Sequence, residues 1–293
     1  MMKFFEGRFS STLFHPTLIW FVLSMGAFVT LILFSLQIQE WTVLRTAAFF
    51  IPQTFLITAL FCPLHESIHG VGSPNKTINS LMLHAVSLSY LSFSPVFRWI
   101  HIEHHANLGL GKKDPDYFIE SKSMLEAFLK SFVLFLHYNN HFSKCATKYR
   151  HRKMIIFLTM MIPVAVCGLS FLAVGSIMPL IISWIAPAFI GVGILAFVDT
   201  VIPHAFHARQ DRGSEPKTYA NAQQRIIENT LVIEAPRAIE WFMGFQNYHL
   251  VHHLRPTLPW FEYKNYWIAH QDLLSTKNAK TVQFQDAVRK SIA

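Results

Sequence analysis

Three short histidine motifs contain the residues of this sequence best suited to chemistry. In a helix, residues three and four apart lie on one face, so each motif can direct its imidazole rings at one point. Imidazole suits iron, zinc, copper and nickel, and the three scattered cysteines offer no thiolate cluster that would compete. The pattern therefore predicts metal binding. The motifs are His65-Glu-Ser-Ile-His69, His101-Ile-Glu-His104-His105 and His249-Leu-Val-His252-His253.

The two H-x2-H-H motifs are the most specific part of this pattern. With 16 histidines in 293 residues, a lone H-x3-H is expected about once by chance, whereas two H-x2-H-H motifs have a probability on the order of 0.001. The eight motif histidines exceed what one ion can coordinate, so two ions are the simpler hypothesis. A further H-x3-H, His137-Tyr-Asn-Asn-His141, lies within the chance expectation. We interpret it as structural rather than as a ligand pair, together with His15, His84, His151 and His270.

The composition predicts the kind of protein that must position these motifs. Hydrophobic residues make up 52% of the chain and charged residues only 14%, whereas a soluble domain carries about a quarter charged residues. The apolar content excludes intrinsic disorder. The three scattered cysteines exclude a secreted disulfide scaffold. We therefore expect an all-α integral membrane protein.

Four apolar stretches are long enough to cross a bilayer, which needs roughly 20 helical residues. They are residues 18–36, 43–64, 155–174 and 180–198, and short connections pair them into two hairpins. The stretches 78–93 and 124–136 are apolar but interrupted by polar residues, which is typical of helices at the membrane interface. No cleavable leader and no second domain are expected, so residues 1–293 are interpreted as one domain.

The distribution of basic residues predicts the orientation. The net charge is +8, and lysines and arginines are abundant between the hairpins but missing from the short loops within them. The positive-inside bias then places both termini and the middle stretch in the cytoplasm. The first motif ends the second span, so all three motifs would meet just below the bilayer in a helical cap. No aromatic-interleaved basic stripe indicates nucleic-acid binding.

These motifs, and their spacing around two hairpins, resemble those of the membrane fatty-acid desaturase superfamily. The stretches HESIHGVGSPNKTIN, FRWIHIEHHANLG with DPDYF after it, and NYHLVHHLRPTLPW are most similar to bacterial-type β-carotene hydroxylases and neighbouring fatty-acid desaturases. The resemblance covers roughly residues 18–263. It implies a non-haem di-iron centre that uses O₂, with the eight motif histidines as iron ligands. No H-P-G-G haem motif is present, so the resemblance implies a separate electron donor such as ferredoxin or cytochrome b5.

The function expected from this resemblance is O₂-dependent oxidation of an unactivated C–H bond in a membrane lipid. Acyl-lipid desaturation and carotenoid-ring hydroxylation use the same ligands, so the motifs leave both open. Three residues separate the histidines of the first motif. Many acyl-lipid desaturases and carotenoid hydroxylases have the same spacing, whereas acyl-CoA Δ9 desaturases have four residues there, so the resemblance makes a soluble acyl-CoA substrate less expected. The alternative is a metal transporter or metal-sensing membrane protein. Transporters place polar ligands near the bilayer midplane, so motifs at span ends favour the enzyme.

Three acidic residues are further candidates. Glu66 and Glu103 lie inside the motifs and either orient imidazole N–H groups or are merely solvated. Asp199 stands at the end of the fourth span, where a carboxylate is costly and therefore a functional candidate.

A ninth ligand is expected just after Asp199. Related desaturases complete the second metal with a residue from this helix end, and His204 lies at about the depth of His65. His207 is the alternative. Pro203 is expected to kink or break the helix and turn the next residues toward the site.

Overall fold

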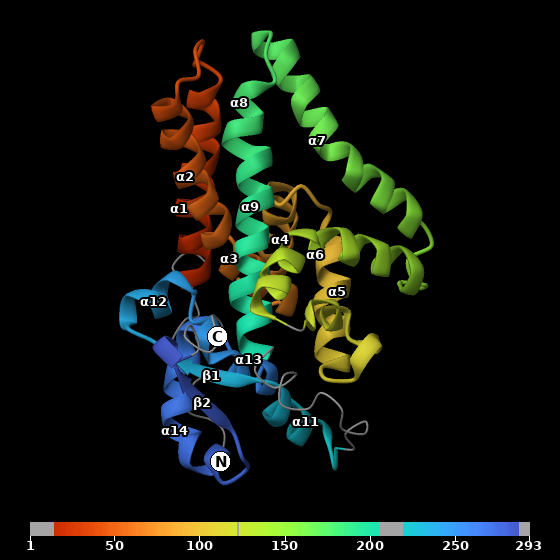
Figure 1. Ribbon diagram of the computed structural model, residues 1–293, viewed down its shortest axis with the longest axis vertical. Coiled ribbons are helices and arrows are strands. Elements are labelled where there is room, and N and C mark those ends of the chain that lie inside the picture. Colours follow the sequence, from red (N-terminus) through yellow and green to blue (C-terminus); the bar gives the residue numbers. More distant parts are fainter. Residues whose placement is uncertain (1–14, 122, 205–218, 287–293) are drawn as a thin grey trace.

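The computed structural model describes residues 15–121, 123–204 and 219–286 (Figure 1). Within these ranges, four apolar helical runs are long enough to cross a membrane, as expected. The second run continues through the whole first histidine motif, five residues further than predicted. The runs are α1 (Pro16–Ser35), α2 (Val43–Ala59) with α3 (Phe61–His69), α7 (Arg152–Val174), and a fourth run from Met178 to His204. The fourth run contains α8 (Met178–Leu180), η4 (Ile181–Ile185), α9 (Ala186–Leu195) and η5 (Ala196–Val201).

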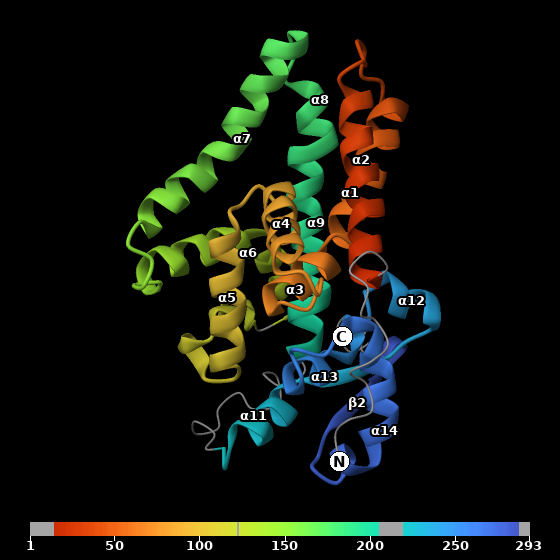
Figure 2. The same ribbon diagram turned by 180° about the vertical axis from the view of Figure 1, so that it is seen from behind.

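The two hairpins pack against each other through α2 and α9, while α7 leans away from α8 and α9 (Figures 1 and 2). Gly191 allows the close approach, because a Cβ at this position would lie 2.6 Å from Ile57 Cγ2. Buried hydrogen bonds link the helices where water is excluded. Gln53 Nε2 donates to the Phe28 carbonyl at 3.0 Å, and the Ser35 and Ser183 hydroxyls are 2.9 Å apart.

The fourth run has two π-helical segments, and each ends two residues before a proline. The segment η4 precedes Pro187 and η5 precedes Pro203. Proline has no N–H to donate and its ring crowds the carbonyl of the preceding turn, which a wider turn relieves. Within the described residues, the expectation that Pro203 breaks the helix is wrong, and a kink at Pro203 stays a prediction. The helix passes through Pro203 and ends its described part at His204.

Three helices between the hairpins carry the second motif and cover the site. The helix expected over 78–93 spans Lys76–Ser89, so it ends four residues earlier than predicted, and the next helix begins at Ser94 at an angle of 100° to it. The other expected interface helix is longer than 124–136. The three helices are α4 (Lys76–Ser89), α5 (Ser94–Asn107) and α6 (Met124–Cys145). Two short turns, η2 (Gly111–Lys113) and η3 (Pro115–Ile119), connect α5 to α6.

The C-terminal segment lies across one end of the spans (Figure 1). Two parallel strands, paired from Leu231↔Lys280 to Glu234↔Gln283, hold it together. An apolar cluster that includes Leu250, Val251 and Tyr263 fixes the third motif. The elements are α11 (Ala222–Asn229), β1 (Leu231–Glu234), α12 (Arg237–Phe242), η6 (Gln246–Tyr248), α13 (His249–Leu254), η7 (Trp260–Glu262), α14 (Tyr263–Ser275) and β2 (Lys280–Gln283).

Candidate metal centre

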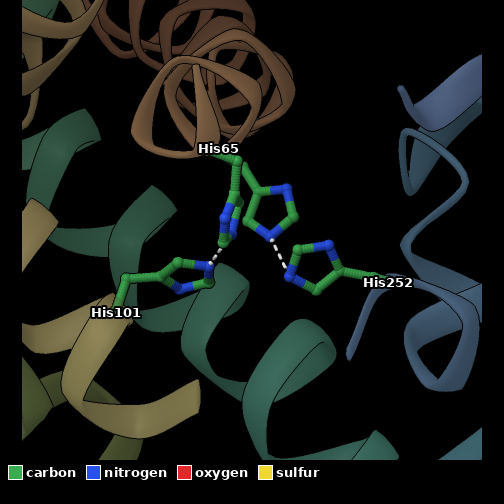
Figure 3. Close-up of side chains that lie close together, drawn as sticks. His65, His101 and His252 are labelled. Atoms are coloured by element: carbon green, nitrogen blue, oxygen red, sulfur yellow. Dashed lines mark hydrogen bonds between the residues drawn. The ribbon is translucent and has the colours of Figure 1, made fainter. Parts of the chain in front are cut away.

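The first cluster of histidines brings together five rings from α3, α5 and α13. His65 Nε2 lies 3.0 Å from His252 Nε2, and His69 Nε2 lies 2.8 Å from His101 Nε2. His105 Nε2 joins these pairs at 3.1 Å from His101 and 2.8 Å from His252. Figure 3 shows the rings of His65, His101 and His252 facing a common centre. One nitrogen from each of His65, His69, His101 and His252 lies within 4.8 Å of the others.

The second cluster brings together four rings, from α5, α13 and the end of the fourth run. One nitrogen from each lies within 4.8 Å of the others. His249 Nε2 is 2.8 Å from His204 Nε2 and 3.0 Å from His253 Nε2. His104 completes the set, with its ring centroid 5.0 Å from that of His253. Of the two candidates for a ninth histidine, His204 therefore joins a cluster, and His207 lies outside the described residues.

The second and third motifs each divide between the two clusters, so the expectation that each motif aims at one point is wrong for them. A helix turns about 100° per residue, so residues four apart differ by about 40°, whereas the residue three along lies about 60° to the other side of the first and about 100° from the residue after it. His101 and His105 face the first cluster while His104 faces the second. The third motif does the converse: His252 belongs to the first cluster, and His249 and His253 to the second.

Burial keeps most of these rings neutral. It lowers the pKa of His101, His249 and His253 well below the usual range, and neighbouring imidazoles lower it further. A neutral imidazole has one nitrogen that carries a proton and one with a free lone pair. Nitrogens that converge within 3.1 Å of one another, as those of His101, His69 and His105 do, are therefore suited to share a cation.

Two aspartates after α5 hold His104. Its Nδ1 lies 2.8 Å from Asp114 Oδ1 and 3.3 Å from Asp116 Oδ2. The backbone amides of Gly109 and Asp116 donate to the Asp114 carboxylate and fix it. Burial alone would lower the pKa of His104, but the carboxylates of Asp116 and Asp114 outweigh it and raise the pKa to about 9. With its proton held on Nδ1, His104 turns Nε2 toward the cluster.

Glu66 acts on the site from the far side of His252. Tyr263 donates its hydroxyl proton to Glu66 at 3.3 Å, so the His252 Nδ1–H must donate to the Tyr263 oxygen, 3.0 Å away. The amide of Trp260 also donates to Glu66. His252 therefore presents its Nε2 lone pair to the first cluster. Of the two alternatives for Glu66, the structure favours orientation of a ring over solvation, because Glu66 is fully buried.

His204 is fixed in the same way, because its Nδ1–H donates to the Asn229 carbonyl at 2.9 Å. Three rings thus have Nδ1 held by a partner, so that Nε2 is left to face a cluster. Ordinary side-chain packing does not require this arrangement, whereas ligation does. The candidate donor atoms of both clusters are imidazole nitrogens, which fit iron, zinc, copper or nickel better than a hard cation such as calcium.

The remaining sequence candidates lie apart from both clusters. Glu103 is half-buried and accepts from Asn107 on its own helix. His137 stacks on Phe118, with ring centroids 4.3 Å apart, and His141 lies against Trp99. The other histidines predicted to be structural have local partners or lie at helix ends. They are His15 against Phe261, His84 bonded to Ser94, His151 at the start of α7 and His270 bonded to the Tyr266 carbonyl.

Asp114, Asp116 and Tyr263 are site residues that the sequence motifs did not identify. The two aspartates belong to the DPDYF stretch after the second motif, where Asp114 lies ten residues after His104. Their position soon after a histidine motif was the available signal. Tyr263 lies 197 residues from Glu66 and offered none.

An apolar cavity borders the clusters. Its empty volume is about 850 Å³, including the open space at its mouth. Rings of both clusters line it, including those of His65 and His104, and its other walls come mainly from α3, α6 and η5, with smaller parts from α5 and α9. A long apolar molecule in this cavity would lie against the histidines. Asp199 also lines it, and is buried.

Sequence comparison assigns the chain to a family. The family model for fatty acid desaturases matches residues 39–284, which include all three motifs and His204. No curated protein matches the sequence. The family implies an oxidoreductase that acts on lipids in association with a membrane, and the four apolar runs and the histidine clusters agree with this. The chain belongs to the fatty acid desaturase family.

Proposed function

We propose that the protein is a non-haem di-iron oxidoreductase that uses O₂ to oxidise an unactivated C–H bond of a lipid. The observation that carries the proposal is the pair of converging imidazole clusters beside one apolar cavity. The first cluster would hold one iron and the second cluster the other. The proposed ligands are His65, His69, His101, His105 and His252 for the first, and His104, His204, His249 and His253 for the second.

Iron with O₂ supplies an oxidant strong enough to abstract hydrogen from a methylene group, which no side chain can do. The residues of this chain provide the positioning. Asp114 holds His104, and Glu66 holds His252 through Tyr263, so that each ring keeps a lone pair toward its cluster. The apolar walls of the cavity exclude water and orient one C–H bond against the clusters.

The substrate we propose is an acyl chain or a carotenoid ring. Family membership supports a lipid, and the mainly apolar lining of the cavity suits a hydrocarbon. Desaturation removes a second hydrogen, whereas hydroxylation adds oxygen, and the same ligands serve either outcome. All nine histidines gather where α3 and the fourth run end, which favours this chemistry over metal transport through the midplane.

We further propose that the site and both termini face the cytoplasm and that electrons arrive from a separate protein such as ferredoxin or cytochrome b5. The net charge of +8 supports attraction of a small acidic donor. Turnover at sub-saturating ferredoxin should then fall as salt concentration rises. Salt-independent turnover would mean that the basic residues only set the orientation.

Lipid and pigment analysis tests the proposed reaction. Cells that express the protein with a ferredoxin and its reductase should accumulate a desaturated acyl lipid or a hydroxylated carotenoid that control cells lack. Expression of the His104→Ala variant, which removes one proposed ligand, should abolish this product. Identical lipid and pigment profiles with wild-type protein, vector and variant would contradict the proposed oxidation.

A further inference from the structure

A second, smaller cavity adjoins the one beside the histidines. Its empty volume is about 370 Å³, and it lies among α1, α3, η5 and the turn after α12. The two cavities share three lining residues, namely Phe61, Leu195 and Asp199. These residues form the junction between the cavities. A lipid that extends through both would pass the Asp199 carboxylate.

Asp199 differs from the other polar groups of the larger cavity. Apart from the histidines, those groups are satisfied by protein partners: Tyr90 donates to the Ile57 carbonyl at 2.7 Å, and Tyr138 donates to Asp116 at 2.5 Å. Thr200 is hydrogen-bonded to the same tyrosine. Asp199 is 5% exposed, and its Oδ1 has no hydrogen-bond partner among the described residues. A buried acceptor left unpaired is costly, so a ligand that donates to it would gain affinity.

The surroundings of the smaller cavity indicate how a lipid would lie. Phe242 lines it, and both Trp241 and Phe242 of α12 are 46% exposed. Aromatic residues of this kind are typical of the membrane interface. Figure 1 shows α12 at the end of α1 and α2. A lipid with its headgroup near α12 would thus place its head-proximal atoms at Asp199 and its hydrocarbon chain beside the histidines.

We propose that Asp199 determines substrate specificity by accepting a hydrogen bond from a hydroxyl or amide N–H group in the head-proximal part of the lipid. This inference rests on the proposed function and deepens it, because it names the class of lipid. A simple ester has only acceptors in this position and would leave the carboxylate unsatisfied. A lipid with a donor group close to its hydrocarbon chain is the expected substrate.

Binding to the detergent-solubilised, iron-loaded, full-length protein tests the proposal. The probes are tritiated hexadecylglycerol, which has two free hydroxyl groups, and its dimethyl ether, which has the same chain and no donor. A hydrogen bond to the otherwise unpaired Asp199 oxygen should make the first bind about tenfold tighter to the wild type. Asp199→Leu should reduce this preference to within about twofold, and Asp199→Asn should retain part of it through its amide oxygen.

Gln53→Leu is the matched control. Gln53 is also buried in a spanning helix with an unpaired oxygen, but it lines neither cavity. This variant should keep the wild-type preference. Equal binding of both probes by the wild type would overturn the proposal even if Asp199 variants fail to fold, and so would a preference that survives in Asp199→Leu. Failure of the proposed function is distinguishable, because the protein would then oxidise neither probe while the binding preference remained.

Discussion

The two H-x3-H pairs of this chain have the same spacing and different surroundings. The rings of His65 and His69 are 5.3 Å apart, and those of His137 and His141 are 5.9 Å apart. The first pair meets rings from α5 and α13, as with His69 and His101. The second pair meets Phe118 and Trp99 instead.

The difference teaches that helical spacing places two rings on one face but does not make a metal site. A site requires other elements to bring further ligands to the same point, together with partners that hold the outward nitrogen of each ring. The first pair meets such further ligands, since His65 faces His252, a ring whose outward nitrogen is held by Tyr263. Within the described residues, the second pair joins no such group.

Removal of one ring from each pair should give the largest difference in iron content and turnover between two variants. His65→Ala removes a proposed iron ligand, so we expect loss of at least one iron and a fall in turnover of about 100-fold or more. His137→Ala removes only a ring stacked on Phe118 and should leave iron and turnover near wild type. Iron analysis and product formation measure both. Comparable losses in the two variants would show that spacing alone predicts ligation.

The second cluster sharpens the comparison, because His204 belongs to no motif. His204→Ala should reduce the iron content from two per chain toward one and abolish most turnover, since it removes one of four converging nitrogens. His207→Ala is the control, and we expect it to retain both irons. Full iron content and activity in both variants would restrict the site to the three motifs.

Asp114 tests the role of the partners that hold a ring. Asp114→Ala leaves His104 in place but removes the acceptor 2.8 Å from its Nδ1. Loss of such a partner typically costs about 10–100-fold in metal affinity or activity. Competition with an iron chelator would measure the affinity of the second cluster, with Glu126→Ala on the exposed start of α6 as the control. Unchanged chelator resistance in Asp114→Ala would contradict this role.

The smallest effect is expected from the two glutamates of the motifs. Glu66→Gln keeps an oxygen for Tyr263 but removes the charge, so turnover should fall by roughly tenfold or less. Glu103→Gln should have no measurable effect, because the Glu103 carboxylate accepts a hydrogen bond from Asn107 on its own helix and belongs to neither cluster. A larger loss in Glu103→Gln than in Glu66→Gln would reverse their assignment.

Local patterns predicted much of this structure. Apolar runs without acidic residues or lysine predicted the four spans, because a helix needs roughly 20 consecutive apolar residues to cross the hydrocarbon core of a bilayer. The histidine motifs lie on helices, as their spacing indicates, and the expectation that His204 lies close to the motif histidines agrees with its place in the second cluster. The spans and the helical motifs could be predicted because they depend only on residues close together in the sequence or on the thickness of a bilayer.

Features that depend on distant parts of the chain were not predictable. The division of the second motif between clusters depends on how α5 is rotated against α3 and α13. The link from Glu66 through Tyr263 to His252 joins residues 197 positions apart. The helix continues through Pro203 after the π-helical turn of η5, a wider turn that the local sequence pattern did not predict.

The metal content of the purified wild-type protein tests the central claim most directly. Protein reconstituted with ferrous iron under anaerobic conditions, freed of unbound metal, should contain two irons per chain. The His137→Ala variant should contain the same number. One iron or fewer in the wild type, or retention of zinc in preference to iron, would contradict the assignment of two iron sites to the two clusters.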